Sequence, residues 1–184
     1  MNLNLIASFV IGGLILLSIL DVNNNIREQG VVSAADYQVK THTSTVAEVL
    51  SEDIRKVGYL YDGNSPVETI TATSITFHAD VTGDDSSDTI KWIFDTSRPD
   101  MATSNPSDTV LHRIVNADST DFSGGVNGFA LTFYDSLGVQ TTNPATVKKI
   151  RIVLTCESLM PMDGTRYARS GWQKTFRPIN LDKL

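Results

Sequence analysis

The stretch LIASFVIGGLILLSIL, residues 5–20, contains no ionisable side chain and continues into an amphipathic stretch that ends in EDIRKVGY, residues 52–59. Counted from Met1, the first charge is Asp21, which leaves about 20 residues, or roughly 30 Å of α-helix. That length is enough to cross the hydrocarbon core of a bilayer. The two stretches together predict one long N-terminal helix, apolar in its first half and amphipathic in its second.

The apolar stretch is typical of a retained membrane anchor rather than a cleavable signal peptide. A signal peptide carries a basic segment before its apolar run, whereas no Lys or Arg precedes Arg27. Residues 21–28 are polar and bulky where a small-x-small cleavage site would stand. A buried helix of a soluble core is the alternative, because the run is short for a membrane span. The polar composition of the remaining chain favours an N-terminus inside and a domain outside the membrane.

Composition limits the function classes. The net charge of −6 argues against binding to nucleic acid or to an anionic membrane surface. Cys156 is the single cysteine, so the chain has no intrachain disulfide, and its apolar neighbours predict a buried thiol. No nucleophile elbow, phosphate-binding glycine loop or pair of catalytic acids is present. We therefore expect a protein that is not an enzyme and has no small-molecule substrate.

Apolar residues between positions 31 and 57 recur in steps of three and four, which is the period of an α-helix. The stripe consists of Val32, Ala35, Val39, Val46, Val49, Leu50, Ile54 and Val57. Gly58 is the expected stop of this helix. Weak helix formers at residues 23–25 and at Gly30 predict a bend or local melting between the two halves.

After Pro66 the apolar period changes from helical to two, which indicates β-strands. The candidate strands are residues 74–79, 89–94, 109–115, 126–135 and 147–155, with long loops at 95–108 and 157–171. We expect an antiparallel meander with one face covered by the amphipathic half of the helix, an α+β fold. The predicted parts are a membrane half (residues 1–22), an amphipathic half (23–58) and a globular β-domain (59–184).

The order of these elements resembles the type IV pilin and pseudopilin architecture, and within it the minor pilins and minor pseudopilins. The phrases that carry the resemblance are EDIRKVGY at 52–59, GVNGF at 125–129, FYDSLG at 133–138, KIRIVL at 149–154 and the terminal Asn180-Leu181. The likeness covers nearly the whole chain. It implies a pilin-like fold in which a long helix packs on an antiparallel sheet, and a structural subunit of a type IV pilus or a type II secretion pseudopilus.

Two features of the family have no counterpart in this sequence. No basic leader ending in glycine precedes Leu5, and the usual glutamate near the start of the apolar segment is missing, with Asn4 and Ser8 as the polar residues there. Some tip-located pseudopilins are known to lack that glutamate. The resemblance therefore implies a minor subunit more than a repeating major one.

The densest acidic cluster is the predicted hairpin turn that contains Asp80, Asp84, Asp85 and Asp88. Several carboxylates in a short loop suit a hard cation such as Ca²⁺, which takes many oxygen ligands. The spacing differs from an EF-hand because no glutamate closes the loop. A solvated turn is the alternative interpretation.

Other polar and aromatic residues give weaker indications. His42, His78 and His112 are scattered over three elements, which predicts no zinc site. Asp53 and Arg55 suggest a structural ion pair at the end of the helix. Trp92 and Trp172 are expected to pack in the sheet core and against the C-terminus. The basic and aromatic residues of segment 166–177 indicate either a protein contact or the last strand.

These observations predict a non-enzymatic filament subunit, anchored in a bacterial inner membrane with its domain in the periplasm or outside, or assembled in a filament. Its partners would be other pilin or pseudopilin subunits, contacted through the N-terminal helices. The expected assembly residues are Leu5, Phe9, Gly12, Gly13, Leu14, Leu16, Leu17 and Leu20. Gly12 and Gly13 either allow close helix packing or reflect ordinary membrane-helix composition. The alternative function is a single-pass binding module that does not polymerise.

Overall fold

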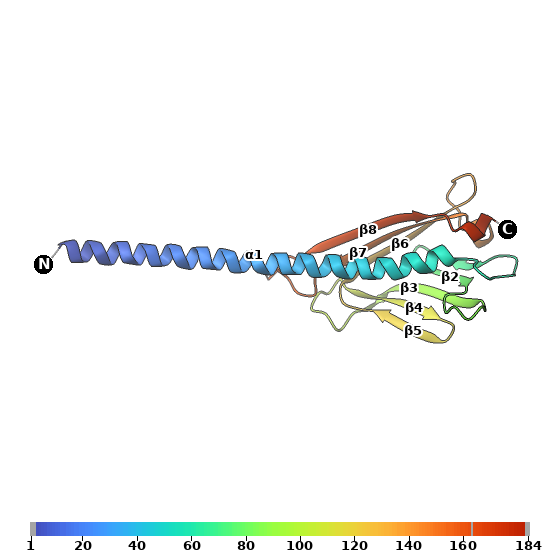
Figure 1. Ribbon diagram of the computed structural model, residues 1–184, viewed down its shortest axis with the longest axis horizontal. Helices are drawn as coiled ribbons and strands as arrows, with labels where there is room; N and C mark the ends of the chain where they lie inside the picture. The colour runs from blue at the N-terminus through green and yellow to red at the C-terminus, as the bar shows by residue number, and fades with distance from the viewer. Residues whose placement is uncertain (1–2, 163, 183–184) are drawn as a thin grey trace.

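The structure, a computed structural model, describes residues 3–162 and 164–182. Its dominant element is α1, a single 54-residue α-helix from Leu3 to Lys56 that projects far beyond the rest of the chain (Figure 1). The bend or melting expected at residues 23–25 and Gly30 is wrong, because the helix is continuous there. A few weak helix formers cost only about 1 kcal/mol each, which does not break a helix with long hydrogen-bonded segments on both sides.

Helix α1 ends where the sequence indicated. Gly58 has a φ of +79°, the left-handed conformation that terminates helices and that glycine adopts without strain. Its N–H donates to the carbonyl of His78 at 2.8 Å, so the end of the helix is tied to a strand. Arg55 and Lys56 occupy the last turn, where positive charge interacts favourably with the helix dipole.

The chain after the helix forms two antiparallel sheets. The first contains β1 (Val67–Ile70), β2 (Ser74–Ala79), β3 (Asp88–Pro99), β4 (Thr109–Val115) and β5 (Asp118–Phe122), paired in that order. The second contains β6 (Val126–Tyr134), β7 (Lys149–Glu157) and β8 (Arg169–Phe176). Two short 3₁₀ turns, η1 (Pro144–Thr146) and η2 (Ile179–Asp182), complete the chain.

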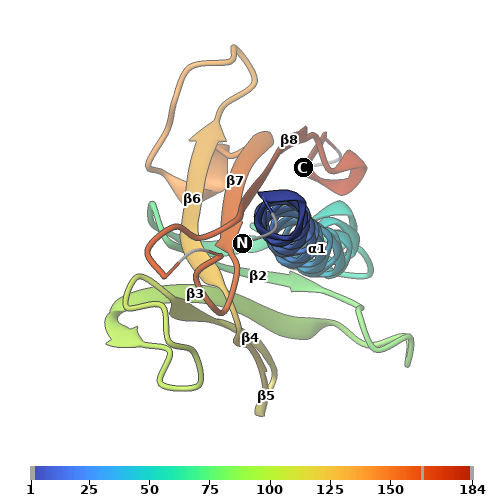
Figure 2. The same cartoon turned by 90° about the vertical axis from the view of Figure 1, so that its left-hand side faces the viewer.

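The α+β class and all five expected strands are confirmed, but the single meander is wrong. The strands divide into two sheets, linked by a hydrogen bond from the N–H of Leu131 to the carbonyl of Ala72 at 2.8 Å. Strands β1 and β5 were not predicted, β8 was one of two interpretations of its segment, and β3 extends into the segment that was expected to be a loop. Viewed along the helix, the two sheets lie on either side of α1, with β6–β8 on one side and β3–β5 on the other (Figure 2).

The core lies where the second half of α1 meets both sheets. Leu50 and Ile54 of the helix are fully buried, as are Phe77 and Trp92 of the first sheet and Leu154 of the second. Strand β7 shows the clearest alternation, with every second residue from Ile150 to Cys156 buried. The predicted inward face of this strand is therefore confirmed.

A buried ion pair fixes the end of α1 to the first sheet. The carboxylate of Asp53 accepts hydrogen bonds from Arg113 on β4, at 2.7 and 2.9 Å, and from the indole N–H of Trp92 on β3 at 2.9 Å. The expected pairing of Asp53 with Arg55 is thus wrong. Residues two apart on a helix point in different directions, so Arg55 is exposed while Asp53 faces the core.

Candidate functional site

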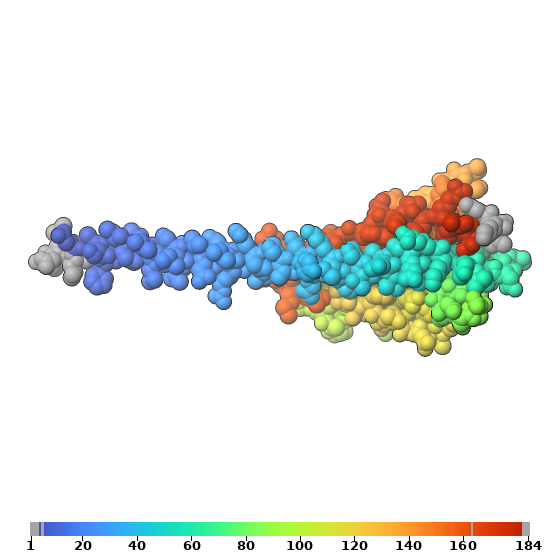
Figure 3. Space-filling model, in the orientation of Figure 1, coloured from blue at the N-terminus to red at the C-terminus, as the bar shows by residue number. Residues whose placement is uncertain are grey.

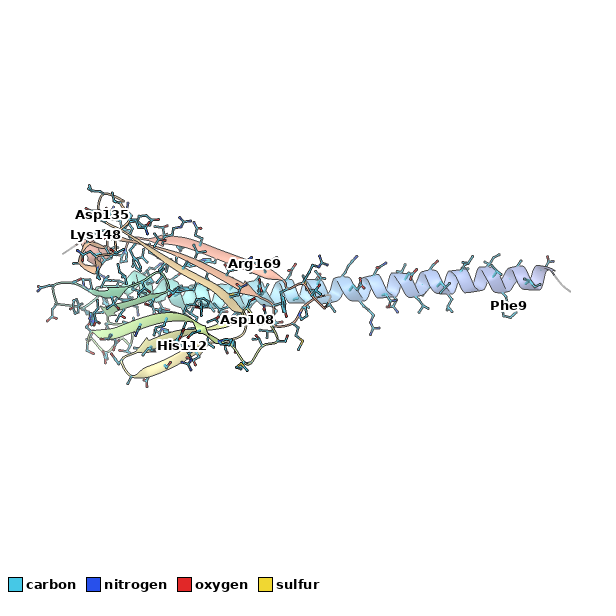
Figure 4. All side chains as sticks on the ribbon, turned by 180° about the vertical axis from the view of Figure 1, so that it is seen from behind. Phe9, Asp108, His112, Asp135, Lys148 and Arg169 are labelled. Atoms are coloured by element: carbon cyan, nitrogen blue, oxygen red, sulfur yellow. The ribbon has the colours of Figure 1, made fainter. Side chains whose placement is uncertain are left out.

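The most unusual surface of the protein is the exposed first half of α1, residues 6–34, which we call the rod. Its first part, residues 6–20, has no ionisable side chain. Every described side chain from residue 6 to residue 34 is exposed, and Ala35 is the first to be partly covered by the domain. Figure 3 shows this segment standing clear of the globular part, and Figure 4 places Phe9 near its free end. The backbone of Leu5 belongs to the helix, whereas its side chain lies outside the described residues.

The exposed side chains of the rod are large and apolar. Among the expected assembly residues Phe9 is 77% exposed, Leu14 and Leu16 60% each, Leu17 59% and Leu20 49%. Moving such a side chain out of water contributes about 1.5–3 kcal/mol. A rod that presents this many of them in water is therefore strongly disfavoured, and a non-aqueous environment or other helices must cover it.

This helix is long and apolar enough to cross a membrane, and it is the one such helix among the described residues. Its most apolar window is not buried at all inside the protein. The alternative of a buried helix in a soluble core is therefore wrong. The hydroxyls of Ser8 and Ser18 donate to the carbonyls of Asn4 and Leu14, at 2.9 and 3.0 Å. These bonds satisfy the polar groups within the helix, as a hydrocarbon environment requires.

Gly12 and Gly13 leave the backbone of the helix exposed, because neither has a side chain. A Cβ added to either glycine would meet no atom within 4 Å. A shallow groove of about 460 Å³ runs here, lined by Ser8, Phe9, Gly12, Gly13 and Leu16. Small residues on an apolar helix allow another helix to approach closely. The geometry agrees with a packing surface and equally with ordinary membrane-helix composition.

Where α1 enters the domain, a cleft of about 480 Å³ lies between the helix and two loops. It is lined by Tyr37, Gln38, Val39, Thr41, His42, Thr45, Ser123, Gly124, Glu157, Ser158 and Leu159. Burial lowers the pKa of His42, which keeps its imidazole neutral at physiological pH. The side-chain amide of Asn105 donates to Glu157 at 2.8 Å, so that carboxylate is already engaged.

The acidic hairpin between β2 and β3 closes on itself. The Asp80 carboxylate accepts hydrogen bonds from the backbone N–H groups of Gly83 and Asp85, at 2.6 and 3.2 Å. Asp88 accepts from the N–H groups of Val81 and Thr82, both at 3.1 Å. Burial raises the pKa of Asp88, but its hydrogen bonds, first that from Asn116, outweigh this effect and leave the pKa below its usual value.

The carboxylates of the remaining two acids, Asp84 and Asp85, make none of these four hydrogen bonds. Asp84 is exposed and bonded to Ser86, which lowers its pKa, and Asp85 adopts a φ of +61°. Among the residues that the structure describes, no three His, Cys, Asp or Glu side chains are placed to hold a metal ion. The calcium loop and the solvated turn both stay predictions for this hairpin.

The histidines and the cysteine occupy unrelated environments. His78 stacks on Tyr61 with 4.7 Å between ring centroids, and His112 contacts Asp121 at 2.7 Å. Cys156 is buried as expected, and burial raises the pKa of its thiol to about 11. A thiol with this pKa is protonated and unreactive at physiological pH.

The aromatic residues lie close to their expected places. Trp92 is fully buried in the first sheet, and Trp172 on β8 packs beside Phe176 with 6.1 Å between ring centroids. The segment from Arg169 to Phe176 is the last strand, which confirms one of the two interpretations of this basic stretch.

A buried carboxylate immediately before β4 was not predicted from the sequence. Asp108 is fully buried, and in the described part of the chain neither of its side-chain oxygens has a hydrogen-bond partner. Burial raises its pKa, the nearby side chain of Thr103 acts in the opposite direction without a hydrogen bond of normal geometry, and the charges of Glu157 and Asp100 add to the increase. The sequence analysis placed Asp108 at the end of a long loop, residues 95–108, and loop residues are mostly exposed. No feature of that segment indicated that this carboxylate is buried.

Comparison with known proteins adds no relative to this picture. No family model, no curated protein and no solved structure matches the chain.

Proposed function

We propose that this chain is a non-enzymatic structural subunit, similar to minor pilins and minor pseudopilins, that enters a membrane-anchored pilus or secretion pseudopilus. One observation carries the proposal. A single continuous helix has two different surroundings, because its second half is buried against two sheets while residues 6–34 project with no described residue of the domain covering them. The large apolar side chains of this half are stable only when lipid or other helices remove them from water.

The physical logic of assembly follows from the composition of the rod. In the bilayer, lipid covers the apolar side chains from Phe9 to Leu20. The rod can leave the bilayer when equivalent rods replace the lipid, since apolar contact is then preserved. Filament formation would exchange lipid contact for helix packing, with Gly12 and Gly13 on the groove where a second helix approaches.

The proposed location is the inner membrane of a bacterium, with the β-domain in the periplasm or outside, or the same protein assembled in a filament. Residues 21–34 carry charged and polar side chains on the exposed helix, among them Asp21, Arg27 and Glu28. This stretch separates the apolar segment from the domain by about 20 Å of helix. The domain would therefore stand away from the bilayer, within reach of neighbouring domains.

A second candidate is a single-pass binding module that never polymerises. Exposed apolar residues on three separate loops favour it: Met101 is 89% exposed, Leu137 87% and Met160 74%. Isolated exposed apolar residues are common on monomeric proteins, whereas a long bare rod is not. The filament subunit therefore remains the proposed function.

A charge placed inside the rod tests the proposal. We expect Leu14→Asp to abolish recovery of the protein in sheared filaments, because an ion in an apolar helix bundle is strongly disfavoured. Asn23→Asp is the matched control, since it adds the same charge on the same helix beyond the apolar run. Circular dichroism would establish that the domain remains folded. Equal recovery of Leu14→Asp and Asn23→Asp in filaments would contradict the proposal.

A further inference from the structure

A small pocket lies on the outer face of the three-stranded sheet, the face turned away from the core. Its volume is about 400 Å³. The residues that line it are Tyr134, Gly138, Lys149, Arg151, Gln173 and Thr175. Two of these residues are cations and none is an acid, in a chain whose net charge is −6. The pocket is therefore a local positive site on a negatively charged protein.

The register of the strands places the lining side chains on one face. Every second residue of β7 from Ile150 is buried, so Lys149 and Arg151 point to the outer face. Lys149 pairs with Tyr134 on β6, and Arg151 pairs with Thr175 on β8. Directly paired residues of antiparallel strands have their side chains on the same face. Regular strands therefore hold these four side chains in place.

Both cations have unused hydrogen-bonding capacity. A terminal nitrogen of Arg151 donates to the side-chain oxygen of Gln173 at 2.9 Å, while its Nε has no partner in the described part of the chain. Among the same residues, the amine of Lys149 makes no hydrogen bond or ion pair. Guanidinium and ammonium groups bind carboxylates and other oxyanions through charge-assisted hydrogen bonds. The pocket thus offers donors of this kind to an anion.

Two acids lie at the ends of these strands, and both are engaged elsewhere. The carboxylate of Asp135 accepts hydrogen bonds from the N–H groups of Leu137 and Val139, both at 2.9 Å, and so holds the turn after β6. Glu157 lies at the other end of β7, where it is opposite Arg169 and accepts from the amide of Asn105. Neither acid forms an ion pair with the two cations of the pocket within the described chain.

The rest of the outer face is polar and made of small side chains. The residues beside the pocket on this face are Thr132, Thr155, Gly128, Ala130 and Gly171. The structure describes every residue of the three strands, and none of them is an exposed large apolar residue. Such a face offers hydrogen bonds to hydroxyl groups and no recess for an apolar side chain.

We propose that this pocket binds the carboxylate of an acidic saccharide, a uronic acid unit of a larger glycan. Lys149 and Arg151 would hold the carboxylate, and the hydroxyl of Thr175 would bond the sugar hydroxyls. The ring of Tyr134 presents an apolar body with a polar end, which suits the edge of a sugar ring. The inference goes beyond the proposed function and does not rest on it, because the pocket belongs to the β-domain alone.

The position of the pocket suits a ligand outside the membrane. Asp135 and Lys148 are the neighbours in sequence of the lining residues Tyr134 and Lys149. Figure 4 places both at the end of the domain opposite to Phe9. The pocket therefore lies far from the apolar segment, where a glycan can reach it.

Nucleic acid is the competing anionic polymer. Its affinity for proteins comes from many phosphate contacts along the strand and from bases stacked on aromatic side chains. The pocket has two cations close together and one aromatic ring, in an acidic chain. This arrangement suits one acid group with hydroxyl neighbours better than a run of phosphates.

Isothermal titration calorimetry of the full chain in neutral detergent, at low salt, tests the pocket with trigalacturonate as the probe. We expect trigalacturonate to bind, and its carboxyl-reduced counterpart to give no heat because it lacks the charge. Inorganic phosphate is the probe for a bare anion site. Single-stranded oligothymidylate is the probe for nucleic acid.

Substitutions locate the binding. Lys149→Gln and Arg151→Gln should each lower the affinity for trigalacturonate about tenfold, the effect of losing one charge-assisted hydrogen bond. Tyr134→Ala should weaken trigalacturonate and leave phosphate unchanged. Lys91→Gln is the matched control, since it removes the same charge at an exposed position on β3 and should change nothing. Circular dichroism establishes that each variant is folded, and either cation variant is sufficient for the test.

Each outcome decides the inference. Absence of heat with trigalacturonate, or equal affinity in Lys149→Gln, Arg151→Gln and Lys91→Gln, would overturn the site. Phosphate that binds as tightly as trigalacturonate would overturn the saccharide as the ligand, and so would tighter binding of oligothymidylate. None of these results bears on assembly through the rod, which the recovery of Leu14→Asp in filaments tests separately.

Discussion

The carboxylate of Asp53 holds the guanidinium of Arg113 through two hydrogen bonds, one from Nε at 2.7 Å and one from a terminal nitrogen at 2.9 Å. The pair joins the last turn of α1 to β4, and the indole of Trp92 donates to the same carboxylate. The side-chain hydrogen bond with Asp53 raises the pKa of Arg113, which remains charged. A force applied along the rod would reach the first sheet through this contact.

Loss of the Asp53 charge should weaken the domain. Asp53→Asn leaves the half-buried Arg113 without its counter-charge, and we expect the free energy of unfolding to fall by about 2–4 kcal/mol. Urea unfolding of the full chain in detergent, followed by tryptophan fluorescence, measures the change. Glu52→Gln, an exposed neighbour, should change stability by less than about 0.5 kcal/mol. Equal effects of the two substitutions would contradict the structural role of the pair.

Two glycines, one inside α1 and one just beyond its end, should respond in opposite ways to alanine. Gly58 has a φ of +79°, and an added Cβ would lie 3.1 Å from the Cβ of Asn180, so Gly58→Ala should cost about 1–3 kcal/mol in unfolding free energy. Gly30 lies within the helix in open space, so Gly30→Ala should strengthen it by about 0.5–1 kcal/mol. Urea unfolding reports the first change and amide hydrogen exchange around residue 30 the second. Tolerance of alanine at position 58 would argue against the observed helix end.

Asp108 should make the protein more stable in mild acid. Its folded pKa is raised above the ordinary value of 3.8, so its contribution to stability is complete below that value and is lost as pH rises through the folded pKa. Asp108→Asn removes the buried charge, and we expect stability at neutral pH to increase by about 1–3 kcal/mol. The difference between variant and wild type should shrink as pH falls toward 3.8. Parallel stability curves across this range would contradict the assignment.

The sequence predicted helices and strands correctly where one buried face imposes a regular spacing of apolar residues. The stripe of Val46, Leu50, Ile54 and Val57 and the alternation in β7 both reflect one buried face, and both are confirmed. Strands β1 and β5 were missed because they are short edge strands with little apolar content. The stretch from Asp118 to Phe122 contains one large apolar residue, so no alternation marks it as a strand.

Contacts between distant parts of the chain were not readable either. Arg55 is close to Asp53 in sequence, but helix geometry turns it away from the core, and the actual partner Arg113 lies 60 residues further along. The separation into two sheets likewise depends on which strands pair, and hydrophobic spacing does not encode that choice. The exposed rod was predictable because helices of soluble proteins seldom lack charge over a run of this length.

Immunogold electron microscopy of native membranes with an antibody to the β-domain tests most directly whether the rod from Phe9 to Leu20 is covered by like rods. We expect gold particles on filaments for the wild-type protein and particles scattered over the membrane for Leu14→Asp. Scattered label for the wild-type protein, folded and retained in the membrane, would contradict it.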